Sequence, residues 1–318
     1  MNEAIDQVLE AEVAGNPQTG HLWVRQSLKK LCIALEHILT LRICCETLRR
    51  LLKKRRIGLK SNVKRLHPKP SPDRDKQFQY ITEQRANFRQ AGLPIISVDT
   101  KKKELLGPFF NRGKQWCTKA TEVYTHDFPS YAEGKAIPYG IYDVTHNRGY
   151  VAVGTSADTP EFAVDAIVWW WKTFGLILYP GASALLILAD GGGSNGYRPR
   201  RWKQLLQEKM VDAFGLEVTV CHYPTGASKW NPIEHRLFSQ ISRTWAGTPL
   251  TSQAVVLEAL TNTHTSTGLI VEATLFDRIY EKALSVSDAD MNLLNLQKHS
   301  TCPNWNYSFR PRKQGSYL

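Results

Sequence analysis

Apolar residues recur along the chain in five short runs, separated by longer stretches with a helical repeat. The runs are rich in β-branched and aromatic side chains and end at turn-forming residues, which predicts strands. They lie at 93–100, 136–145, 149–155, 184–190 and 216–224. The second and third runs flank a short turn-rich segment, which is typical of an antiparallel hairpin.

Helices are predicted between and around these strands. Thr159 begins a Thr-Pro-Glu sequence, which supplies an N-cap, a first-turn proline and a first-turn acid. The helical repeats cover 74–92, 159–175, 199–215, 231–245 and 252–263, and they are followed by a strand at 269–275 and a helix at 288–297. This order predicts an α/β fold, in which helices cover both faces of a mixed five-stranded sheet.

Two shorter amphipathic helices are predicted near the N-terminus. Ser27 is a suitable N-cap for the first, and Gly58 follows the second as a stop. The second helix is basic, because residues 41–70 contain eleven Lys and Arg against one acid, Glu46. A basic run of this kind can be a solvated face. Two short helices with a basic second member also resemble a helix-turn-helix, whose second helix enters the DNA major groove. The candidate DNA contacts are Arg49, Arg50, Lys53 and Lys54.

Composition narrows the class of protein. The 318 residues are 42% hydrophobic and 22% charged, which is typical of a globular protein, and the net charge is +12. The longest apolar runs fall short of the roughly 20 residues that cross a bilayer. The acidic N-terminus lacks the pattern of a signal peptide, so we expect a cytoplasmic protein without membrane contact. Six scattered cysteines without C-x-x-C spacing predict reduced thiols.

Acidic residues stand at the ends of two buried strands. The runs "IISVD" and "LLILAD" end on Asp99 and Asp190, at the carboxyl edge where open α/β sheets bind their ligands. If the two strands are neighbours, their carboxylates repel unless a cation lies between them. Mg²⁺ is commonly held by one or two carboxylates together with phosphate oxygens and water. We therefore predict a divalent cation at this edge.

A third acid, Glu234, lies in "KWNPIEHRLFSQ" at the start of a helix. Asn231 can act as the N-cap, and Asn-x-x-Glu is also a capping pattern, so Glu234 could merely satisfy a backbone N–H. The two strand-end aspartates favour a ligand role. Basic residues beside these acids are placed to hold phosphates, which positions nucleic acid without reading its sequence. These residues are Lys101, Lys102, Lys103, Lys229, His235 and Arg236.

The glycines after Asp190 also match the G-x-G-x-x-G spacing of dinucleotide-binding proteins. That motif requires an acid about 20 residues further on, at the end of the next strand, to bind the ribose. Here the next strand ends in "VTVCHYP", which contains no acid. A dehydrogenase is therefore disfavoured.

Several motifs together resemble one known family. They are "PIISVDTKKKELLG", "HDF", "GKAIPYGIYDV", "EFAVDAI", "ADGGGSNG", "VCHYPTGASKWNPIEHRLFSQIS" and "WNYSFRP". From about residue 20 to 310 the chain resembles the Rhodopirellula-type transposases of bacterial insertion sequences, which are DDE enzymes with an RNase H-like core. The resemblance implies that Asp99, Asp190 and Glu234 are the catalytic, metal-binding triad.

The resemblance also implies the reaction and the partners. Two Mg²⁺ or Mn²⁺ ions would support cleavage of DNA at the element ends and strand transfer to target DNA. No protein nucleophile is needed, so Ser194 and Tyr223 are interpreted as positioning or structural groups. The implied partner is double-stranded DNA, bound by a homo-oligomer in the bacterial cytoplasm at the nucleoid. The alternatives are an RNase H-like metal-dependent nuclease and a non-catalytic DNA-binding protein.

Four regions follow from these predictions. A helix-turn-helix-like DNA-binding segment is expected at 1–66, and a linker with the proline-rich "HPKPSPDRD" and a helix at 67–90. The RNase H-like catalytic core is expected at 91–250 and a C-terminal extension at 251–318. Only about twenty residues precede the basic helix pair, which is shorter than the family resemblance leads us to expect.

Overall fold

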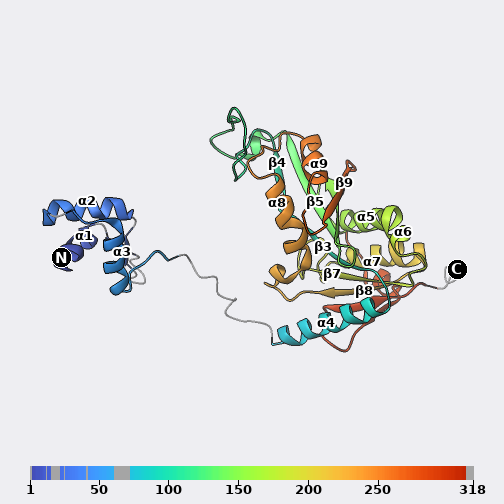
Figure 1. The fold of residues 1–318 in the computed structure, drawn as a ribbon. Helices are drawn as coiled ribbons and strands as arrows, with labels where there is room; N and C mark the ends of the chain where they lie inside the picture. Colours follow the sequence, from blue (N-terminus) through green and yellow to red (C-terminus); the bar gives the residue numbers. More distant parts are fainter. Residues whose placement is uncertain are drawn as a thin grey trace. The chain divides into compact units, whose positions relative to one another are not determined.

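The computed structural model describes residues 2–11, 13–15, 22–24, 26–40, 42–60 and 72–312. The chain divides into two compact units, Met1–Arg65 and Leu66–Leu318 (Figure 1). Part of the predicted proline-rich linker falls at 61–71, outside the described residues. Within the described ranges, no helix has the length and apolar character needed to span a membrane.

The first unit is a small helical bundle. It contains helices α1 (Asn2–Ala11), α2 (Leu28–Leu39) and α3 (Cys45–Lys54), and strands β1 (Val13–Gly15) and β2 (Leu22–Val24). Ser27 caps α2, as predicted, because its side chain accepts a hydrogen bond from the N–H of Lys30. Helix α1 was not predicted from the sequence, and its apolar residues pack against α2 and α3. Arg55 after α3 pairs with Asp6 of α1 at 2.5 Å, which ties the basic segment to the acidic one.

The second unit is built on one large mixed sheet, which contains nine strands in the described residues. The five predicted strands form its centre in the order β8-β7-β3-β5-β6, and further strands from the C-terminal region extend both edges. The strands are β3 (Ile95–Thr100), β4 (Glu104–Leu106), β5 (Gly134–Asp143), β6 (Arg148–Gly154), β7 (Ala184–Ala189), β8 (Glu217–His222), β9 (Ile270–Phe276), β10 (Leu296–Lys298) and β11 (Asn306–Phe309). Strands β5 and β6 form the predicted antiparallel hairpin, and β3, β7 and β8 run parallel to one another. The α/β fold class is confirmed, with a sheet wider than five strands.

Helices cover both faces of this sheet. They are α4 (Arg74–Gln90), α5 (Pro160–Trp170), α6 (Leu176–Leu178), α7 (Arg200–Leu206), α8 (Ser239–Thr244), α9 (Gln253–Thr261) and α10 (Asp288–Asn292), with π-helical turns η2 (Trp171–Gly175), η3 (Gln207–Asp212) and η5 (Glu234–Phe238) and 3-10 turns η1 (Pro129–Tyr131) and η4 (Ser228–Trp230). Thr159 is the N-cap of α5, as its sequence predicted.

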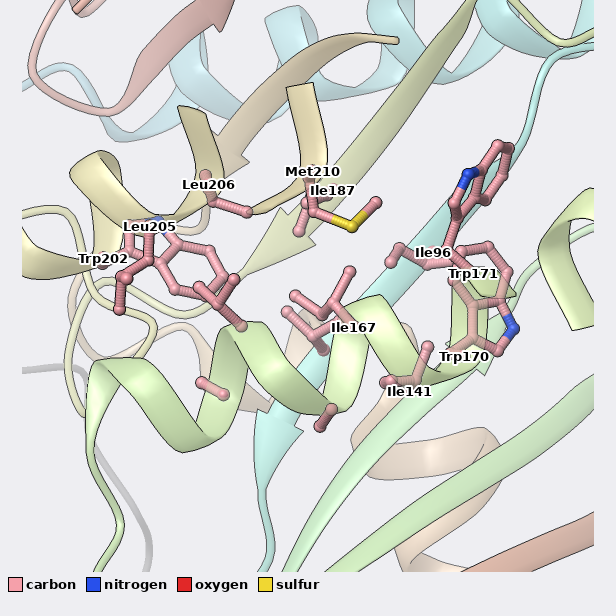
Figure 2. Close-up of a cluster of buried hydrophobic side chains, with 14 of the residues drawn as sticks. Ile96, Ile141, Ile167, Trp170, Trp171, Ile187, Trp202, Leu205, Leu206 and Met210 are labelled. Carbon is pink, nitrogen blue, oxygen red and sulfur yellow. The ribbon is translucent and has the colours of Figure 1, made fainter. Parts of the chain in front are cut away.

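The main hydrophobic core lies between the sheet and helices α5 and α7. Alternate strand residues such as Ile96 and Ile187 are fully buried against Ile167, Trp202 and Met210 (Figure 2). The residues between them in each strand point to the other face, where α4 packs on one part of the sheet and η5, α8 and α9 on another. The sheet is therefore covered on both faces, and the ends of its strands are where it can bind ligands.

Candidate active site

Asp99 and Asp190 lie side by side at the carboxyl ends of neighbouring strands. Strand β3 pairs with β7 in parallel, and the register places Val98 opposite Ala189. The next residue of each strand is an aspartate, so the adjacency that the sequence predicted is present in the fold. Both carboxylates line one cavity.

The cavity has a volume of about 580 Å³ and mixed charge. Its walls consist of the two strand ends, the glycine loop after β7 and the loop after β8. The charged residues in its lining are Asp99, Lys101, Lys102, Lys103, Asp158 and Asp190. A basic rim around an acidic floor can accept a phosphodiester together with cations.

Asp158 is a fourth carboxylate that the sequence analysis did not identify. Its Oδ1 accepts a hydrogen bond from the hydroxyl of Thr100 at 3.1 Å, and its Oδ2 lies 3.4 Å from the ammonium of Lys103. It precedes Thr159, the N-cap of α5, and neither a strand end nor a motif marks it in the sequence. Asp158 therefore helps to hold the loop after β3 in place.

Glu234 begins η5, close to the two aspartates but outside the lining of the cavity. The capping interpretation of this segment is wrong. The N–H of Asn231, which a capping glutamate would have satisfied, donates to the carbonyl of Ser228 at 2.9 Å. The hydroxyl of Ser97 on β3 accepts instead from the N–H of Ile233 at 3.1 Å, which fastens the start of this helix to the strand that carries Asp99.

Burial and neighbouring negative charge raise the pKa of two of the three acids, Asp99 and Glu234. Burial, and then the charge of Asp190, raises the pKa of Asp99 to about 8. The same two causes, in the same order, raise the pKa of Glu234. Negative charges held this closely in a partly buried place are unfavourable, and a cation offsets that cost.

Carboxylate oxygens are the ligands that Mg²⁺ and Mn²⁺ prefer, so the chemistry of the donor set fits such ions. In the part of the chain that the structure describes, no three His, Cys, Asp or Glu side chains are arranged so that they could hold a metal ion. The charges of Asp190 and Glu234 both act on the Asp99 carboxylate, and the mutual repulsion of the acids opposes a closer approach.

A buried histidine fixes the backbone of Asp190. His222 at the end of β8 is fully buried, and burial lowers its pKa to about 4, so its ring is neutral. Its Nδ1 lies 2.9 Å from the carbonyl oxygen of Asp190, which can only accept, so Nδ1 carries the proton. Its Nε2 then accepts from the hydroxyl of Tyr307 at 2.9 Å. This role could not be predicted from the sequence, because a histidine at a strand end has no distinctive pattern.

The glycine loop turns sharply after Asp190. Gly193 has a φ of +78°, which a residue with a side chain rarely adopts. The next helix, α7, begins only at Arg200, so these glycines do not open a helix as a dinucleotide-binding motif requires. Ser194 and Tyr223 are buried, in agreement with a structural or positioning role.

The predicted phosphate contacts differ in their surroundings. Lys101 is buried, its ammonium lies 3.2 Å from a carboxylate oxygen of Glu104 and 4.3 Å from the centre of the Trp245 ring, and burial lowers its pKa. These contacts favour a structural role for Lys101. Lys102 is 84% exposed at the rim of the cavity.

The basic residues around Glu234 are exposed. Lys229 lies over the ring of Trp230 at 5.1 Å, and the ring of His235 bonds to the carbonyl of Lys229. Arg236 is exposed one residue further along η5. Their positions beside Glu234 are compatible with the predicted phosphate contacts.

In the N-terminal unit, the four candidate DNA contacts lie on the exposed surface of α3. Arg49 and Arg50 both approach Glu46, at 2.7 Å and 3.9 Å. Lys53 and Lys54 lie in the last turn of the helix.

Residues 4–311 match the model of a family described as the Rhodopirellula transposase DDE domain. No curated protein matches the chain. Among solved structures, it is similar to a Mos1 transposase paired-end complex with the left transposon end, at 14% identity over 81% of this chain and 69% of that chain, with a TM-score of 0.43. A Mos1 strand transfer complex is 15% identical over 81% of this chain and 68% of that chain, with a TM-score of 0.41. A Mos1 mariner paired-end complex with Mn is 14% identical over 74% of this chain and 65% of that chain, with a TM-score of 0.42.

Proposed function

The chain belongs to the Rhodopirellula transposase DDE domain family, and we propose that its reaction takes place at Asp99, Asp190 and Glu234. It is a metal-dependent transposase, an enzyme that cuts and joins DNA. The observation that carries the assignment of the site is the pairing of β3 with β7, which sets two acids side by side in a cavity rimmed by lysines.

The three carboxylates would hold the cations, which we take to be two Mg²⁺ or Mn²⁺ ions. When bound, such ions stabilise the attacking and leaving oxygens of an in-line displacement at phosphorus. The charges of both Asp190 and Glu234 act on Asp99 and raise its pKa, so we propose that all three carboxylates take part in holding the ions. Lys102 and the basic residues beside Glu234 would bind the phosphates of the DNA and so position it at the three acids.

The partners follow from this chemistry. We propose that α3 binds double-stranded DNA at the ends of the element, that the cavity receives the cut end and the target strand, and that the protein acts as a homo-oligomer. We also propose that it acts in the bacterial cytoplasm, at the nucleoid, where this substrate lies.

The test is a strand-transfer assay with duplexes that carry the element ends, in Mg²⁺ or Mn²⁺. Asp190→Asn retains the shape of the side chain and removes its charge, so cleavage and strand transfer should both disappear while duplex binding persists. A nuclease would cut the wild-type substrate without joining it to a target. Full activity of Asp190→Asn would contradict the proposed site.

The role of α3 has its own test. Lys53→Glu combined with Lys54→Glu should weaken duplex binding and flatten its dependence on salt, because fewer counterions are released. Lys29→Glu with Lys30→Glu is the matched control, since it makes the same charge change on exposed positions of α2. Equal losses in the two double variants would show that only net charge matters.

A further inference from the structure

Asn231 occupies the point where the elements that carry the three acids meet. It precedes the helix of Glu234 and is fully buried, although asparagine is a polar residue. Its side-chain nitrogen Nδ2 lies 3.1 Å from Oδ1 of Asp190 and 3.4 Å from the carbonyl oxygen of Val98 on β3. Its side chain therefore contacts Asp190 and the strand that carries Asp99.

The hydrogen bonds around Ser97 determine which way this amide faces. The hydroxyl of Ser97 accepts from the N–H of Ile233, so its single proton is free to be donated. That proton goes to Oδ1 of Asn231. The oxygen of the amide is thereby directed at Ser97 and its NH₂ group at Asp190, because an amide cannot present the same atom to both.

An N–H donor aimed at one oxygen of the Asp190 carboxylate fixes the rotation of that carboxylate about its last side-chain bond. Oδ1 is the oxygen held in this way. The other oxygen, Oδ2, stays available to a ligand in the cavity that Asp190 lines.

We propose that Asn231 is a positioning residue, which orients the Asp190 carboxylate for a divalent cation. Through its hydrogen bond with Ser97, it also fixes the position of the Glu234 helix relative to β3. This inference rests on the proposed function of the three acids. Groups that hydrogen-bond to metal-binding side chains typically change metal affinity or activity by about 10- to 100-fold when they are removed.

The test measures binding of Mn²⁺ alone to the full-length protein by electron paramagnetic resonance of the free ion, with strand cleavage as the second readout. Asn231→Ala should lower Mn²⁺ affinity by about 10- to 100-fold. Asn306→Ala is the matched control, because Asn306 is also a fully buried asparagine, and its side-chain hydrogen bonds go to Gln77 and Thr301 rather than to one of the three acids. It should lower the unfolding midpoint and leave Mn²⁺ affinity unchanged.

A double-mutant cycle tests the path through Ser97. Ser97→Ala removes the group that orients the amide, so it should weaken Mn²⁺ binding by itself. Adding it to Asn231→Ala should cause no further loss, because both changes break the same chain of hydrogen bonds. If Asn231→Ala does not fold, the Mn²⁺ affinity of Ser97→Ala tests the proposal instead. A wild-type Mn²⁺ affinity in Ser97→Ala would then overturn it.

Asp190→Asn separates failure of this inference from failure of the proposed function. If Asp190→Asn loses Mn²⁺ binding while Asn231→Ala and Asn306→Ala both retain it, Asn231 has only a structural role and the triad stands. If Asp190→Asn binds Mn²⁺ as the wild type does, the proposed metal site itself is wrong.

Discussion

Replacing Tyr307 by phenylalanine should destabilise the second unit far more than the loss of one hydroxyl would suggest. Tyr307 is 1% exposed on β11. Its hydroxyl accepts from the indole N–H of Trp202 at 3.1 Å and donates to Nε2 of His222 at 2.9 Å. Both partners are fully buried, so water cannot replace the hydroxyl when it is removed.

The magnitude follows from the two groups that Tyr307→Phe leaves without a partner. Each buried donor or acceptor that loses its partner costs about 1–3 kcal/mol, so the free energy of unfolding should fall by about 2–6 kcal/mol. The ring itself is retained, so the substitution leaves no large cavity.

The assay is urea unfolding of the full-length protein, followed by far-UV circular dichroism and tryptophan fluorescence. Tyr131→Phe is the control, because that side chain is 56% exposed and its hydroxyl is free to bond with water. A surface change of this kind should stay within about 0.5 kcal/mol of the wild type. If the two variants were equally stable, the hydrogen-bonded chain from Trp202 to His222 would contribute nothing, and the reasoning would be refuted.

Two further predictions concern other parts of the sheet. Gly140→Ala on β5 should lower the free energy of unfolding by about 1–3 kcal/mol and should reduce DNA cleavage, because a Cβ there would lie 2.5 Å from a ring carbon of Phe238 in η5. Gly134→Ala on the same strand is the control and should have neither effect, because its Cβ would lie at an ordinary 3.6 Å from the nearest side-chain atom. Equal urea midpoints and cleavage rates in the two variants would contradict this prediction. Burial lowers the pKa of His299. As the pH falls below about 6.5, this histidine therefore takes up a proton more readily in the unfolded chain than in the folded one, and the free energy of unfolding decreases as the pH falls. His299→Gln should lose less stability than the wild type between about pH 7.5 and about pH 5.5 in urea titrations, and an equal loss would exclude this histidine as a cause.

The centre of the fold could be predicted because its signals are local. Runs of buried β-branched residues identify the strands, and the acids at the ends of β3 and β7 come together once those strands are neighbours and parallel. The edges of the sheet carry a weaker signal. Strands β4 and β10 have only three residues each, too few to show an alternating pattern.

The supporting residues of the site could not be predicted from local pattern. Asn231 matches the pattern of an N-cap, and its actual side-chain partners, Ser97 and Asp190, lie far from it in the sequence. His222 and Asp158 carry no motif of their own, and their roles depend on which loops the sheet brings together. Such roles are properties of tertiary contacts, which one sequence does not reveal.

Two different constraints fix the three acids, and they differ in rigidity. Asp99 and Asp190 are set by backbone pairing between β3 and β7, whose register cannot slip by one residue without turning every buried side chain to the wrong face. Glu234 is set by packing of its helix on the sheet, where Gly140, directly across from Asp99, leaves room for Phe238 to approach. Packing yields more easily than strand register, so adjustment of the site on binding cations and DNA should come from the helix of Glu234. The Ser97 hydroxyl, bonded both to Ile233 and to Asn231, limits that movement and links it to the orientation of Asp190.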